Sequence, residues 1–127
     1  MPLTEAGRDF IASAIINDSP TFFTNANARL GAGDSTAAFD AADTDLQAAS
    51  NKLRKAMEAT YPQRTGNVLT FRSLFGTSEG NFNWNEWGLF NAGSGGVMLN
   101  RKVENLGTKA STQSWQLTVD LTVAIGA

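Results

Sequence analysis

Residues Asn81–Asn91 read NFNWNEWGLFN, an aromatic-rich stretch near the middle of the sequence. Phe82–Asn91 predicts a β-strand, because aromatic residues favour strands. Val97–Asn105 predicts the strand that returns, and the glycine-rich Gly93–Gly96 between the two predicts a tight loop. We therefore expect a β-hairpin at the centre of the fold.

One ion pair is expected to set the register of this hairpin. If Phe90 lies opposite Val97, then Glu86 lies opposite Arg101. These are the only charges on a face otherwise lined by Trp84, Phe90, Val97, Leu99 and Val103. A lone charge against a core is costly, whereas arginine can hold a carboxylate with two hydrogen bonds. We expect Glu86 and Arg101 to form a structural pair.

The opposite side of the same strand supplies candidates for a subunit contact. By strand alternation Trp87 and Leu89 point away from Trp84 and Glu86. Large aromatic and apolar side chains are common in protein interfaces. Trp87 and Leu89 are therefore candidates for contacts with another subunit, and Phe39 of the Ser35–Asp45 loop is a third.

Further strands flank the hairpin in sequence. From Trp115 to Ile125 apolar and polar residues alternate, which is the clearest strand pattern in the chain. Val68–Phe75 and Thr21–Leu30 also alternate, and Gly31–Asp34 predicts a turn. Short strands joined by glycine-rich turns predict a mainly β fold, an antiparallel β-sandwich or sheet.

One α-helix and one long polar loop complete the expected fold. Thr4 can cap a helix over Thr4–Ile16, with Glu5 near its positive end. Asn17–Pro20 predicts its end. Ser35–Asp45 holds too little apolar material for a core element and predicts a long surface loop. Lys52, Arg54 and Lys55 form the one basic cluster, which we expect to be a solvated face.

Residues 45–60 allow two structures. Leu46, Ala49, Leu53 and Met57 fit a helical stripe, and local propensity agrees. The alternative is one helical turn near Asp45–Ser50 followed by a strand over about Lys55–Tyr61.

The predicted core gathers the apolar side chains of the helix and the strands. Residues 1–127 are expected to form a single domain around it, because the chain has the length of one ordinary domain. The predicted core residues are Phe10, Ile11, Ile15, Phe71, Trp84, Phe90, Leu99, Val103, Leu117, Val119, Leu121 and Val123.

Composition limits the chemistry that the chain can perform. It contains no cysteine and no histidine, which removes disulfides, the commonest general base and the commonest metal ligand. The net charge is −2, and no basic face is evident, so nucleic-acid binding is not expected. No apolar run approaches the roughly 20 residues that cross a bilayer. Met1–Arg8 lacks the features of a signal peptide, so we expect synthesis in the cytoplasm without export.

Two constellations of acids have a functional and an ordinary interpretation. Glu79 and Glu86 would suit glycoside hydrolysis, but any two acids can be named in this way. Oxygen ligands suit calcium, but the spacing of the acids in one loop does not match an EF-hand, which favours solvated loop acids. These are Asp34, Asp40, Asp43 and Asp45. We expect no catalytic residues, no metal, no cofactor and no enzymatic activity.

The order of these segments resembles the N-terminal domain of phage tail-collar fibre proteins. That family opens with a Leu-Thr-Glu…Gly helix and a strand ending in a Gly-Asp turn. It continues with a basic cluster, a Trp-x-Glu-x-Gly-Leu-Phe-(Asp/Asn)-Ala strand and a final alternating strand. The matching segments are Leu3–Gly7, Leu30–Asp34, Lys52–Lys55, Trp84–Ala92 and Trp115–Val123. Met98–Lys109 also looks like small structural proteins of phages.

The resemblance implies a structural component of a tailed-phage virion, made in the host cytoplasm. In the family this domain anchors a longer trimeric shaft, whereas this sequence ends at Ala127. A tail, collar or fibre-attachment adaptor is therefore expected, assembling with itself as a trimer or higher ring and with other virion proteins. The alternatives are a capsid decoration protein, a carbohydrate-binding module using Trp87 or Trp115, and a small hydrolase. The resemblance also favours the strand at Lys55–Tyr61, paired with Val68–Phe75.

Overall fold

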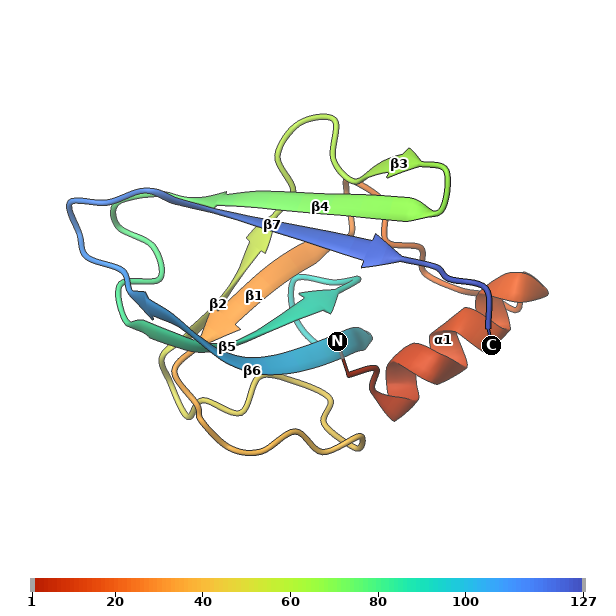
Figure 1. The fold of residues 1–127 in the computed structure, drawn as a ribbon, viewed down its shortest axis with the longest axis horizontal. Helices are drawn as coiled ribbons and strands as arrows, with labels where there is room; N and C mark the ends of the chain where they lie inside the picture. Colours follow the sequence, from red (N-terminus) through yellow and green to blue (C-terminus); the bar gives the residue numbers. More distant parts are fainter. Residues whose placement is uncertain (1, 127) are drawn as a thin grey trace.

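The computed structural model describes residues 2–126 and contains two antiparallel β-sheets and one N-terminal helix (Figure 1). The expected mainly β fold is therefore confirmed. The first sheet has the order β2 (Lys52–Ala56), β1 (Arg29–Gly33), β5 (Asn83–Phe90) and β6 (Met98–Thr108). The second has the order β3 (Gln63–Thr65), β4 (Val68–Phe75) and β7 (Trp115–Thr122).

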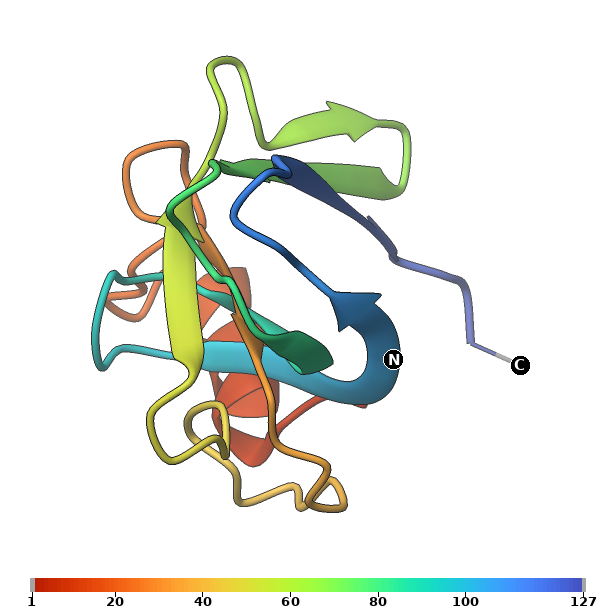
Figure 2. The same cartoon turned by 90° about the vertical axis from the view of Figure 1, so that its left-hand side faces the viewer.

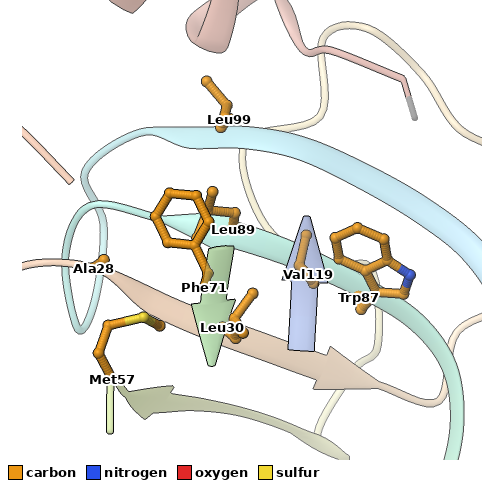
Figure 3. Close-up of a cluster of buried hydrophobic side chains, with 8 residues drawn as sticks. All are labelled: Ala28, Leu30, Met57, Phe71, Trp87, Leu89, Leu99 and Val119. Atoms are coloured by element: carbon orange, nitrogen blue, oxygen red, sulfur yellow. The ribbon is translucent and has the colours of Figure 1, made fainter. Parts of the chain in front are cut away.

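The core lies between the two sheets (Figures 2 and 3). Phe71 of β4 and Val119 of β7 belong to the same buried cluster as Leu30 of β1 and Leu89 of β5. Because these strands belong to different sheets, the cluster joins strands that no backbone ladder connects. Full burial of one such side chain contributes roughly 1.5–3 kcal/mol to folding. The other buried members of the cluster are Ala28, Met57, Trp87 and Leu99.

The predicted core is confirmed in part. Phe71, Trp84, Phe90, Leu99 and Val119 are buried, and Phe10, Leu117 and Leu121 are half-buried against them. Four predicted core residues are instead exposed, and for these the prediction is wrong: Ile11, Ile15, Val103 and Val123. The apolar stripe of the helix is wider than the surface that the sheet offers it.

Among the described residues, β4 and β7 form the longest pairing without a register shift. Phe71 lies opposite Val119 and Leu69 opposite Leu121, facing the core. Arg72 lies opposite Thr118 and donates to its hydroxyl at 3.2 Å. This alternation confirms the pattern expected for both strands.

Helix α1 (Glu5–Ile15) confirms the expected helix to within one residue at each end. The Thr4 hydroxyl accepts from the Gly7 amide at 2.9 Å and caps the helix. Gly7 is the buried residue of the helix, and a Cβ there would collide with the Leu99 carbonyl of β6. The helix thus docks through its glycine. Within residues 2–126 no helix is long and apolar enough to cross a membrane.

β1 and β2 correct two predictions. The strand expected over Thr21–Leu30 begins only at Arg29 and continues through Gly31-Ala32-Gly33, where a turn was expected. Residues 52–56 form a strand, so the helix alternative at 45–60 is wrong, and the strand expected over about Lys55–Tyr61 begins three residues earlier and ends at Ala56. β2 pairs with β1 and not with β4, although Glu58 just beyond it donates its amide to the Arg72 carbonyl at 2.8 Å.

The glycines of β1 explain its misassignment. A Cβ at Gly31 would meet the Phe90 ring at 2.8 Å, and one at Gly33 would collide with the Glu86 carboxylate. These positions are glycine because neighbouring side chains fill the space beside the strand. Local pattern cannot distinguish such a glycine from one in a turn.

Candidate functional site

The β5–β6 hairpin has a different register from the expected one. Phe90 lies opposite Met98, one residue later than predicted, and a bulge between Leu89 and Phe90 adds another. Glu86 consequently lies opposite Val103, and Arg101 lies opposite Gly88. Because the total shift is two residues, Glu86 and Arg101 remain on the same face.

The ion pair itself is confirmed. The Arg101 Nε donates to Glu86 Oε1 at 2.8 Å, and both side chains are 0% exposed. The pair reaches diagonally along the hairpin, because Arg101 lies opposite Gly88, two residues from Glu86. It lies beneath residues 34–51, which we call the clasped loop.

The buried pair anchors the clasped loop through backbone contacts at both ends. The amides of Gln47 and Ala48 donate to Glu86 Oε1 and Oε2 at 2.8 and 2.9 Å. Arg101 donates to the Ala37 carbonyl at 2.9 Å and contacts the Asp43 carboxylate at 3.3 Å. Buried charges need such complete hydrogen bonding to be tolerated. The pair therefore fixes the shape of a loop that has no regular secondary structure.

A second set of contacts joins the clasped loop to the 91–96 turn. Arg54 of β2 lies 3.7 Å from the Phe90 ring centroid and donates to Asp45 at 3.2 Å and to the carbonyls of Ala92 and Gly95 at 2.9 Å each. Burial raises the pKa of Asp45, but hydrogen bonds from Arg54 and the Leu46 amide outweigh it, so the pKa lies below its usual value. The expectation that Arg54 belongs to a solvated face is wrong, since its side chain is 10% exposed.

Lys55 ties β2 to the turn before β5. Its Nζ donates to Glu79 Oε2 at 2.6 Å, and the Gly76 amide donates to Glu79 Oε1 at 2.8 Å. The hydrogen bond from Lys55, followed by that from Gly76, lowers the pKa of Glu79 below 4.5. Glu79 and Glu86 are thus each engaged in separate structural contacts, which gives no support to a paired-carboxylate site.

The acids of the clasped loop are engaged separately as well. Asp43 contacts Arg101, Asp45 contacts Arg54 and Lys52, and Asp34 accepts from Asn51 at 2.8 Å. Asp40 accepts from the Ala42 amide. Among residues 2–126 no three metal-ligating side chains gather in one place.

The tryptophans lie in or against the core. A register irregularity between Trp84 and Glu86 turns β5, so Trp84 packs edge-on against Phe75 and Trp115, at centroid distances of 4.7 and 5.1 Å. Trp84 and Trp87 therefore share the core side, contrary to the predicted alternation.

Two of the three candidate subunit contacts are thereby corrected. Trp87 is 7% exposed and Leu89 is 0% exposed, because their side of β5 faces the second sheet. The Leu89 side chain cannot meet another subunit, and the Trp87 side chain reaches only the inner wall of a hollow between β6 and β7. Phe39 is half-buried on the clasped loop, and its role stays a prediction.

An open apolar groove of about 500 Å³ lies between α1, the segment after it and the second sheet. Its rim includes Ile11, Phe22 and Val123, which are 44%, 49% and 65% exposed. Leu69, Leu121 and Phe23 contribute to its lining. We call this surface the apolar groove, and it is the candidate functional site.

Sequence reasoning missed this surface by placing Ile11 and Val123 in the core. One signal was available in Phe22-Phe23, since adjacent residues of an extended chain point to opposite sides. Phe23 packs edge-on against Phe10 at 4.9 Å, and Phe22 is left outside. Comparison of the chain with protein-family models found no match, and comparison with curated proteins found none.

Proposed function

We propose that this chain is a structural component of a tailed-bacteriophage particle, of the tail, collar or fibre-attachment adaptor type. It acts by binding other virion proteins through surface complementarity. The observation that carries the proposal is the apolar groove, where large apolar side chains are grouped at the surface. Grouped exposed apolar residues mark interaction sites more often than scattered ones do.

The clasped loop supports the same proposal. A buried ion pair and its backbone hydrogen bonds hold the loop in one conformation, although the loop faces outward for much of its length. A preformed surface loses less conformational entropy on binding than a mobile one. The loop thus suits a rigid contact surface.

The resemblance to tail-collar fibre domains supplies the particle to which the surface would belong. Trp84–Ala92 carries most of that resemblance. Its Glu86 holds the clasped loop, and its Trp84 and Phe90 are buried. The motif therefore bears on the fold, and the assembly role rests on the surfaces described above.

Antibody labelling of purified particles in the electron microscope tests the proposal. The particles are those of the phage whose genome encodes the chain. We expect label at the tail, collar or fibre attachment site. Label confined to the capsid surface would identify the chain as a capsid decoration protein and not as an adaptor. Particles that carry no label, although the antibody detects the free chain in the lysate, would contradict a virion role.

A further inference from the structure

We propose that two copies of this chain pair through β7, side by side and antiparallel, so that their β3-β4-β7 sheets join into one continuous sheet. The inference rests on the proposed function, because it names one contact of the assembly. Its basis is a comparison of the four edge strands of the two sheets, β2 and β6 in the first and β3 and β7 in the second.

Three of these edges carry features that discourage pairing. β2 has Lys52, Arg54 and Lys55 within five residues, and β3 is three residues long. β6 is covered in part, because the Thr4 amide donates to Leu99 at 3.0 Å and the Arg101 amide donates to Pro2 at 3.3 Å. Farther along, its register with β5 is irregular. Charge, shortness, cover and bulges are the usual protections of a sheet edge.

β7 has none of these protections. It is eight residues long, pairs with β4 without a register shift and carries Asp120 as its one charge. Among the described residues it has no strand partner on its outer side. A long, regular, weakly charged edge readily accepts another strand.

The sequence of β7 suits pairing with itself about a two-fold axis. With Val119 opposite Val119 of the partner subunit, Leu117 lies opposite Leu121 of the partner subunit on the core side. Thr118 then lies opposite Asp120 of the partner subunit on the polar side. This register keeps apolar with apolar and avoids facing the two carboxylates, which would repel each other.

The open side of the sandwich gives the partner strand a partly apolar hollow to cover. This hollow lies between β6 and β7 and is lined by Trp87, Leu106, Leu117 and Val119, and also by Lys102, Glu104, Thr118 and Asp120. Leu106 is 38% exposed. A strand added beside β7 extends the second sheet on this side, with its own leucines turned toward the first sheet.

Opposite charges at Thr118 test the pairing. Thr118→Glu sets a carboxylate against Asp120 of the partner subunit at both ends of the two-fold contact, and we expect the dissociation constant of the dimer to rise about tenfold or more. Thr118→Lys sets an ammonium group there instead and should tighten the dimer. Sedimentation equilibrium of the full chain measures both.

Effects on folding run in the opposite direction and cannot imitate this result. Within one chain position 118 faces Arg72, so the glutamate variant gains an attraction and the lysine variant gains a repulsion. Thr65→Glu on β3, at the other edge of the same sheet, is the matched control and should leave the dissociation constant unchanged.

A chain that stays monomeric at high concentration overturns the pairing, as does a dimer that responds equally to the two Thr118 variants. Dissociation by Thr65→Glu alone would move the contact to β3 and also overturn it. These results are independent of particle labelling. An unlabelled particle with an intact β7 dimer refutes the virion role alone, and a labelled particle with a monomeric chain refutes the pairing alone.

Discussion

Glu86 and Arg101 are the residues on which the shape of the clasped loop depends. Together they bind both arms of a loop that has no regular secondary structure, and neither has another charged partner of equal burial. Removing Arg101 leaves the Glu86 carboxylate buried without a cation, and removing Glu86 leaves Arg101 with only the longer contact to Asp43. Replacing both with apolar residues removes both buried charges but leaves the loop backbone groups without these partners.

The first prediction compares single and double replacement of this pair. Arg101→Met should lower the free energy of unfolding by about 3–5 kcal/mol, because it leaves the Glu86 carboxylate buried without its partner. Glu86→Leu combined with Arg101→Met should cost less than Arg101→Met alone. Urea unfolding at neutral pH measures both. Equal losses from the single and the double variant would show that the pairing has no role of its own.

The second prediction concerns Gly33, which β1 sets against Glu86. Gly33→Ala places a Cβ in collision with Glu86 Oε2, so the carboxylate must move away from Arg101 or from the loop amides. We expect a loss of about 1–3 kcal/mol in the free energy of unfolding. Gly93→Ala is the control, because the nearest atom to its added Cβ, Arg29 Nε, is 3.8 Å away. A Gly33 variant as stable as the control would contradict the packing described.

At the scale of elements, the sequence predicts the helix and strands that depend on local pattern better than those that depend on contacts between distant residues. The capped helix and the alternating β4 and β7 depend on local pattern. The bounds of the helix and of β4 were predicted closely, whereas β7 ends at Thr122, three residues before the predicted alternation ends. The register of the hairpin depends on a bulge beside Leu89, and β1 depends on space taken by Phe90 and Glu86. These are tertiary effects with no local signal.

The candidate site was less predictable than the fold for the same reason. The Glu86–Arg101 pair could be predicted because an even shift in register preserves the face. The apolar groove could not, since hydrophobicity alone does not say which of Ile11, Phe22 and Val123 finds a covering element. Trp87 and Leu89 were wrongly predicted to be exposed, because strict alternation placed them on the side away from Trp84. The register irregularity of β5 brings Trp84 to their side, which faces the core.

The third prediction concerns the contact between β2 and the turn at residues 76–80. In the folded chain the pKa of Glu79 lies below its ordinary value of 4.5. The contact therefore stabilises the fold above that value, and the stabilisation is lost as the pH falls through the folded pKa. Glu79→Gln should make the free energy of unfolding less dependent on pH between about pH 5 and 3.

Urea titrations at a series of pH values measure this dependence. Lys55→Met removes the largest cause of the lowered pKa, so adding Glu79→Gln to it should change the pH dependence little. A full effect of Glu79→Gln in the Lys55→Met background would refute the role assigned to Lys55.

At the scale of the whole molecule, a small sandwich presents three surfaces of different character. The clasped loop is polar and held by buried charges, the apolar groove is open, and β7 offers backbone along one side. The first two suit rigid docking to other proteins, and the third suits extension of a sheet. An assembly component needs such surfaces and no reactive group.

The fourth prediction tests the groove in the assembled particle. Phe22→Asp puts a charge on the rim of the groove and should lower incorporation into particles about tenfold or more, because interface anchors carry a large share of binding energy. Ile125→Asp is the matched control, since Ile125 is fully exposed and does not line the groove. Circular dichroism checks that both variants fold. Equal incorporation of the two variants would show that the apolar groove does not take part in binding to the particle.

Quantitative mass spectrometry of purified particles, with isotope-labelled peptides of this chain as standards, tests the virion role directly. A structural component predicts several copies per particle in a fixed ratio to the major tail or capsid protein, retained after washing in high salt. Particles that contain no peptide of this chain, or only traces that vary between preparations, would contradict the account.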